Sequence, residues 1–405
     1  MSLFGNSKKE EQSVLLCTIE SGAVHASLCL MHPKSKPFIV HSVTKTIPLQ
    51  ETFDFERFAG ATLQSLADAC QDVITKGVPH VSSRRVRRGH IDAAYCTYGA
   101  PWYVSQTKTV DVKLPGATVV TKSMFQRLLA EHGGPELSLS LTDRNDAPRV
   151  LEQNIINIRL NGYPVSDPYD KEASRVSFSV LIGGISRAFS EYVEDVIGRF
   201  FACDRIYHHA GSATLYFGVR DTLASSDSFL CVDVSGEITD VSAVSDGVLV
   251  ETVSFPVGVR TCMRSFAESA KVLSSEVLGV MQGLKDKTLD EKITAAYEKA
   301  AEHVRGEWQS AFSQAVLPLL EHLPLPKSAF LFGDSGEFVR VKNILIPTKL
   351  SHPQTGDDIA TTLVVAESLS SFCVVREGVR LGHPLTPLSA LHVHRLLTMK
   401  NDQTL

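Results

Sequence analysis

The chain has 405 residues, of which 43% are hydrophobic and 21% charged, and its formal net charge is −5. This length is enough for two or three hydrophobic cores, and the composition is that of a globular protein. The negative balance argues against broad binding to the phosphate backbone of nucleic acids. The eight cysteines are scattered and form no C-x-x-C pair, which predicts reduced, buried thiols.

The first twelve residues are polar and charged, which predicts a flexible leader. They lack the apolar core of a signal peptide, and no later stretch approaches the roughly 18 apolar residues of a membrane span. We therefore expect the protein to stay in the cytoplasm.

Two apolar strands joined by a polar turn are predicted between Val14 and Leu30, with Glu20, Ser21 and Gly22 in the turn. A helix from Asp54 to Lys76 follows, because apolar residues recur there at helical spacing. The next strand runs from Ile91 to Thr97. The basic run from Arg84 to Arg88 between them is predicted to be a solvated loop, with a nucleic-acid or anionic-lipid contact as the alternative.

The pattern changes after Ala100. Residues 104–112 and 150–160 alternate between apolar and polar, and a helix is predicted from Ser123 to Glu131. This segment is interpreted as a small inserted α/β subdomain. The turn residues 161–168 then lead to a strand from Val176 to Leu181.

A second strand, turn and strand begins at Phe229 and contains Asp233, Gly236 and Thr239. Backbone N–H groups in a tight glycine turn can converge on a phosphate, while a neighbouring aspartate can hold a hydrated magnesium ion. The same D-x-x-G-x-x-T spacing also fits an ordinary hairpin turn. Two amphipathic helices are predicted downstream, over residues 266–282 and 289–320, followed by a buried strand that opens into the turn 333–336.

Taken in order, these segments resemble the actin-like ATPase superfamily, which has two phosphate hairpins from two related halves and a late glycine-rich turn beside adenosine. The turn 161–168 and the opening residues 1–9 are similar to the branch that contains the cell-division protein FtsA and PilM of type IV pili. The resemblance spans about residues 13 to 375. It implies an α/β, actin-like (ribonuclease H-like) two-domain fold with a small inserted α/β subdomain.

The resemblance also implies a division of the chain. The expected parts are a leader (1–12), the first actin-like domain in two pieces (13–100 and 166–225), the inserted subdomain (101–165), the second actin-like domain (226–385) with a helical subdomain at about 260–325, and a C-terminal tail (386–405).

The resemblance further implies a site for ATP and magnesium. Asp233 would position magnesium through water, and the other implied contacts are Ser21, Gly22, Ser235, Gly236, Glu237 and Thr239 at the phosphates and Gly333, Asp334 and Ser335 against the adenosine. The chain departs from the family pattern in both turns, at Val259, where the family often has a second glycine, and after Glu276, where the expected lysine towards the ribose is not evident. Thr18-Ile19-Glu20 stands where the family has Asp-x-Gly, and Ser235 replaces a glycine. A carboxylate at Glu20 would repel ATP, so these departures predict weak or lost ATP binding.

The resulting interpretation is a self-associating bacterial scaffold of the FtsA/PilM type that organises cell-division or envelope machinery through protein contacts. The resemblance implies that it works at the inner face of the cell membrane, with only peripheral or indirect contact to the membrane. No catalytic residue is assigned and no nucleic-acid partner is expected. One alternative is an active ATP-hydrolysing protein of the same fold. Another is a PilM-like pilus-assembly adaptor that binds the cytoplasmic tail of a membrane partner in a groove beside the inserted subdomain.

Three further motifs have other interpretations. The tetrapeptide 333–336 matches the nucleophile motif of trypsin-like proteases, with His90 upstream, but the predicted long helices contradict that fold. The pairs His208-His209 and His392-x-His394 could indicate metal ligation, but adjacent histidines point apart on a strand and no cysteine or acidic residue has ligand spacing to them. No metal site besides nucleotide-bound magnesium is therefore expected. Residues 389–399 lie where an FtsA-like protein would carry a membrane-targeting helix, but they offer few basic anchors.

Overall fold

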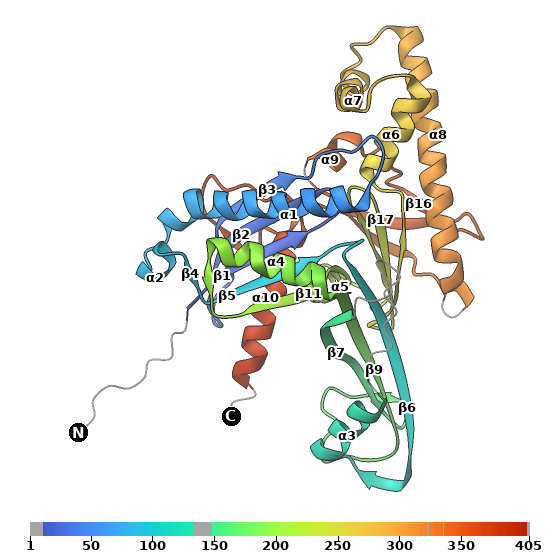
Figure 1. The fold of residues 1–405 in the computed structure, drawn as a ribbon. Coiled ribbons are helices and arrows are strands. Elements are labelled where there is room, and N and C mark those ends of the chain that lie inside the picture. The colour runs from blue at the N-terminus through green and yellow to red at the C-terminus, as the bar shows by residue number, and fades with distance from the viewer. Residues whose placement is uncertain (1–10, 133, 135–147, 322–323, 335, 403–405) are drawn as a thin grey trace.

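The computed structural model describes residues 11–132, 134, 148–321, 324–334 and 336–402. Residues 1–10 of the predicted leader therefore lie outside the described residues. The described chain forms two six-stranded sheets and a four-stranded sheet that projects away from them at the bottom of Figure 1.

The first sheet has the order β11-β5-β1-β2-β3-β18. Strands β1, β2 and β3 are antiparallel, whereas β5 and β11 run parallel to β1. The bounds are β1 Gln12–Ile19, β2 Ala23–Met31, β3 Phe38–Thr46, β5 Ala93–Tyr98, β11 Ile206–Ala210 and β18 Val374–Val375. A separate pair consists of β4 His90–Ile91 and β10 Ala202–Cys203.

The second sheet repeats this arrangement. Its order is β14-β13-β12-β15-β17-β16, with β12, β13 and β14 antiparallel and β15 and β17 parallel to β12. The bounds are β12 Phe229–Val234, β13 Thr239–Ser245, β14 Val248–Phe255, β15 Ser328–Phe332, β16 Leu350–Ser351 and β17 Asp358–Val364. Two related halves, each beginning with a hairpin, are thus present as the sequence indicated.

Helices cover both faces of the first sheet. On β1, Leu15 and Cys17 belong to the core that α1 and α4 cover, whereas the alternate residues Val14 and Leu16 pack with α10. The helix bounds are α1 Phe55–Asp72, α2 Arg84–Arg87, α4 Arg187–Phe200, α5 Gly211–Thr222 and α10 Leu385–Asp402. Helix α1 begins where predicted, because the Asp54 side chain accepts a hydrogen bond from the Arg57 N–H at 2.8 Å.

The projecting sheet has the order β6-β9-β7-β8, and α3 packs on one face of it (Figure 1). The bounds are β6 Tyr103–Val119, α3 Lys122–His132, β7 Pro148–Leu160, β8 Tyr163–Pro164 and β9 Glu172–Ser186. Strand β9 pairs with both β6 and β7, although the predicted boundary of the inserted subdomain at residue 165 precedes it. The division of the chain into domains stays a prediction.

Helices α6, α7 and α8 extend from the second half at the top of Figure 1. Their bounds are α6 Val259–Ala270, α7 Val277–Asp286 and α8 Glu291–Val316, and the short α9 is Glu337–Val341. The prediction of a single helix over 266–282 was wrong, because two helices and a turn occupy this range. Lys271 adopts a left-handed conformation with φ of 57°, which ends α6, and a 3-10 turn at Ser274–Glu276 precedes α7.

One further prediction needs correction. The basic run at 84–88 was predicted to be a loop, but its first four residues form the short helix α2. Burial of Val86 anchors this helix. The segment 389–399 lies within α10, and its apolar residues Ala390, Val393 and Leu397 are buried against the first sheet, so that face is not free to enter a membrane. None of the described helices combines the length and the hydropathy needed to cross a bilayer.

Candidate functional site

The turn between β1 and β2 touches the turn between β12 and β13. A Cβ atom added to Gly236 would lie 2.5 Å from the Cα of Gly22 and 2.6 Å from its nitrogen. Both neighbours are backbone atoms, so no side chain can move aside to make room. Glycine at 236 is therefore required for this contact between the two halves.

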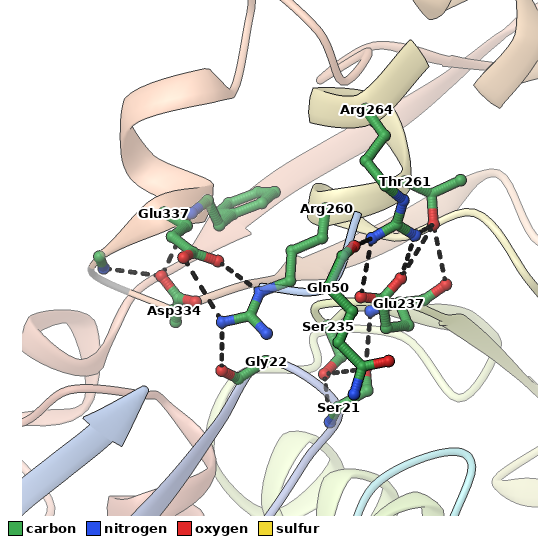
Figure 2. Close-up of polar contacts among 12 residues, drawn as sticks. Ser21, Gly22, Gln50, Ser235, Glu237, Arg260, Thr261, Arg264, Asp334 and Glu337 are labelled. Atoms are coloured by element: carbon green, nitrogen blue, oxygen red, sulfur yellow. Dashed lines mark hydrogen bonds and ion pairs between the residues drawn. The ribbon is translucent and has the colours of Figure 1, made fainter. Parts of the chain in front are cut away.

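Hydroxyl groups join the same two turns (Figure 2). The Ser235 Oγ accepts from the Ser21 N–H at 3.1 Å and from the Ser21 hydroxyl at 2.9 Å. The Glu237 N–H donates to the Ser21 Oγ at 2.9 Å. Ser21 is fully buried, so the space between the turns is filled by their own backbone and side chains.

Helix α6 closes the second turn from the other side. The N–H groups of Val259 and Arg260 donate to the carbonyl oxygens of Ser235 and Gly236 at 2.9 and 2.7 Å. These bonds satisfy two of the backbone donors that a helix leaves free at its N-terminus. A Cβ on Gly258 would meet the same two carbonyl oxygens at 2.5 Å, which explains the glycine at the start of the helix.

Two arginines of α6, four residues apart on one face of the helix, link the halves (Figure 2). The guanidinium of Arg260 is 1% exposed and donates to the Gly22 carbonyl at 2.9 Å and to Glu337 at 3.0 Å. Arg264 donates to both carboxylate oxygens of Glu237, at 3.1 and 2.5 Å, and to the Gln50 carbonyl at 3.3 Å. Both cations are thus used within the protein.

A buried group of two acids and two histidines lies at the base of the turns. Glu20 approaches His25 at 3.4 Å and His383 at 3.5 Å, and His383 lies 3.9 Å from Asp233. Burial, with a smaller contribution from neighbouring acids, raises the pKa of Glu20 and of Asp233 well above their usual range. Burial lowers the pKa of His25 to about 4 and that of His383 well below its usual value.

A cavity of about 330 Å³ opens beside the first turn, and residues of both halves line it. Gly22, Thr44 and Gly382 border it on one side, and Asp334 and Arg340 border it on the other. Asp334 is oriented by its own turn, because its Oδ1 accepts from the Gly336 N–H at 2.7 Å and from the Phe338 N–H at 3.2 Å.

The structure brings five of the predicted site residues into direct contact, and these are Ser21, Gly22, Ser235, Gly236 and Glu237. Asp233 points to the buried acid–histidine group, and the Thr239 hydroxyl donates to the Val257 carbonyl at 2.7 Å. Gly333 packs against the ring of Phe338, where a Cβ would come within 2.2 Å. Ser335 lies outside the described residues.

Sequence reasoning missed the side chains that surround the contact between the two turns, namely Arg260, Arg264, His25, His383 and Glu337. The spacing of Arg260 and Arg264 just after Gly258 was a usable signal, because it places two cations on one face at the start of a helix. The trypsin-like interpretation has no support from His90, which pairs with Asp204 at 3.1 Å in the small β4–β10 pair.

No protein-family model matches the sequence, and no curated protein matches it. Among solved structures, the chain is similar to a chain of a PilM–PilN type IV pilus biogenesis complex, with a TM-score of 0.54 and 12% identity over 94% of this chain and 96% of that chain. The chain has the actin-like ATPase fold.

Lower similarity connects this actin-like chain to two further structures. One is a Bacteroides thetaiotaomicron protein with an actin-like ATPase fold, at a TM-score of 0.36 and 9% identity, covering 89% of this chain and 94% of that chain. The other is the ethanolamine utilization protein EutJ from Carboxydothermus hydrogenoformans, at a TM-score of 0.40 and 9% identity, covering 88% and 86%. The predicted likeness to the FtsA branch stays a prediction.

Proposed function

We propose that this actin-like protein is a scaffold or adaptor of the FtsA/PilM type that acts through protein contacts and has weak or lost ATP binding. The observation that carries the proposal is the backbone contact between Gly22 and Gly236. In the family that the sequence resembles, the corresponding turns hold phosphate between them. Here the two turns would have to separate, and the Ser21–Ser235 bonds would have to break, before a phosphate could enter.

Charge supports the same proposal. Glu20, Asp233 and Asp240 are buried at the base of the turns, and burial raises the pKa of each carboxyl, which makes Asp233 a poor group for holding hydrated magnesium. Arg260 and Arg264 lie beside the turns in Figure 2, and each is already bound to a carboxylate of the protein. ATP binding would therefore require the two turns to move apart, with Arg340 of the adjoining cavity as the cation in position to balance the phosphates.

Calorimetric titration with ATP and magnesium tests the nucleotide part of the proposal. We expect no heat of binding at millimolar ATP from the folded wild-type chain. The comparison variant carries Glu20→Gly and Ser235→Gly, which restore the glycines that the family resemblance implies. If these two side chains are what prevents ATP binding, this variant should bind ATP more tightly than the wild type. Micromolar binding by the wild type that Asp233→Ala removes would overturn the proposal in favour of an active ATP-binding protein.

The adaptor part of the proposal concerns the sheet of β6, β7, β8 and β9. This sheet projects from the two halves and presents Tyr163, Val150 and Ile155, which are 76%, 42% and 38% exposed. We propose that the cytoplasmic segment of a membrane protein binds beside it, as a PilN-type partner of a pilus assembly would. Exposed apolar side chains on a protruding element are typical of such contact surfaces.

Capture experiments with candidate partners test this part. The candidates are cytoplasmic segments of the division and pilus membrane proteins that the neighbouring genes encode, and self-association is measured alongside by light scattering. The variant Val150→Lys/Ile155→Lys should weaken capture by at least about tenfold, since each lost apolar contact costs on the order of 1 kcal/mol or more. The matched control is Leu273→Lys, a 66% exposed residue before α7 that should leave capture unchanged. Equal capture by both variants would remove the projecting sheet from the proposal.

A further inference from the structure

Three metal-binding side chains meet at a place distant in sequence from the two turns. Glu152 comes from β7, His209 from the end of β11 and His392 from α10. One carboxylate oxygen and one ring nitrogen from each histidine lie within 4.8 Å of one another. The side chains of His209 and Glu152 are 11% and 6% exposed, so the group lies just beneath the surface.

His392 is the unusual member of this group. It is 4% exposed, and neither of its ring nitrogens has a hydrogen-bond partner in the described structure. Leaving a buried polar group unpaired costs about 1–3 kcal/mol. The ring is held by packing alone, since it stacks on Phe217 at 5.4 Å and lies edge-on to His209 at 5.1 Å. The fold therefore fixes the imidazole firmly and leaves both nitrogens available.

The carboxylate of the group is held in position by hydrogen bonds. Glu152 accepts from the Ala210 N–H at 2.8 Å and from the Asn154 side chain at 3.0 Å, and it lies 3.3 Å from Nδ1 of His209. Such hydrogen bonds around a ligand set are what orients ligands at metal sites. The nearby cation Arg395 is paired with Asp221 at 3.0 Å, so its charge is partly balanced.

We propose that Glu152, His209 and His392 form a site for one divalent transition-metal ion, with zinc the ion that the donor set fits best. Two imidazole nitrogens and a carboxylate oxygen are ligands that zinc uses, whereas magnesium and calcium take mainly oxygen. The ion would tie the root of the projecting sheet to the first sheet and to the C-terminal helix. The site is independent of the proposed adaptor role.

The buried acid–histidine group below the two turns is a poorer metal site, although Glu20, Asp233 and His383 also converge. The Nδ1 of His383 accepts the Leu385 N–H at 3.0 Å. A neutral ring then carries its proton on Nε2, the nitrogen that faces the carboxylates. This group offers an N–H where a metal needs a lone pair.

Metal content decides the proposal. The full chain is loaded with Zn²⁺, separated from free ion and analysed by mass spectrometry, and Co²⁺ is used in parallel for its visible absorption. We expect about one zinc per chain and a higher Tm in the zinc-loaded protein, because an ion that binds only the folded state stabilises it. His392→Phe keeps the stacking on Phe217 and should weaken zinc binding by about 100-fold or more, as losing a ligand exceeds the usual cost of losing an outer partner.

Controls separate this site from other sources of zinc. His394→Gln, two residues along α10, should bind zinc as the wild type does. Glu152→Gln keeps the hydrogen-bonding shape of the side chain, and it provides the decision if His392→Phe does not fold. Undiminished zinc in folded His392→Phe and Glu152→Gln chains would overturn the proposal. So would zinc that is lost only from His383→Gln, because that result would place the ion in the acid–histidine group.

Discussion

At the scale of single residues, Glu20 stands where the family pattern has glycine, and this buried carboxyl makes the stability of the fold depend on pH. It is 2% exposed and lies between two histidines that burial keeps neutral. Burial, followed by the charges of Asp334 and Asp240, raises the pKa of its carboxyl. The folded protein therefore holds this proton at pH values where the unfolded chain, with a pKa near 4.3, has lost it.

This difference predicts how stability depends on pH. A raised folded pKa contributes stability that is fully present below the unfolded pKa and is lost as the pH rises toward the folded pKa. Glu20→Gln cannot ionise, so its Tm relative to the wild type should increase as the pH is raised from about 4.5 to 8. Thermal unfolding at several pH values measures this gap, with exposed Glu298→Gln on α8 as the control that should show none. A gap that shrinks with rising pH would contradict the assignment.

At the scale of elements, the hairpins were predictable and their contact was not. Alternating apolar residues around a glycine turn predicted the hairpins that became β1–β2 and β12–β13, and both are confirmed. Their turns are 214 residues apart in sequence, so no local pattern could place Ser21 against Ser235. Likewise, the apolar stripe over 266–282 could not show that Lys271 would turn left-handed and divide the helix.

The contact between the turns gives a prediction for Gly236→Ala. The added methyl group would meet the backbone of Gly22 at about the 2.5 Å found for an ideal Cβ, so the turns must move apart. Overpacking of this kind costs roughly 1–3 kcal/mol, and urea denaturation should show the loss. Gly60→Ala on the exposed side of α1 is the matched control, because nothing lies within 4 Å of its Cβ and the change should stabilise the helix by about 0.5–1 kcal/mol. Equal stability of Gly236→Ala and the wild type would mean that the turns are not in contact in solution.

At the scale of the whole molecule, order along the chain predicted the architecture better than any single motif. Strand, turn, strand and helix occurring twice indicated two related halves, and the repeated sheet order confirms this. The place of the C-terminal segment could not be predicted, because α10 has little segregation of polar and apolar residues and its environment depends on the distant strands it packs against. The approach of His392 to His209 was hidden for the same reason, since the two lie on elements far apart in sequence.

The first sheet also has a consequence for synthesis of the protein. One face of β1 and β5, with Val14, Leu16 and Tyr95, is covered by Ala390, Val393 and Leu397 of α10. At about 5–20 residues per second, a ribosome needs roughly 15–60 s to pass from β5 to α10, and this apolar face stays open during that time. Chains released before α10 is made would keep this face exposed and become substrates for chaperones and proteases, so the face is covered only after translation has passed Leu397.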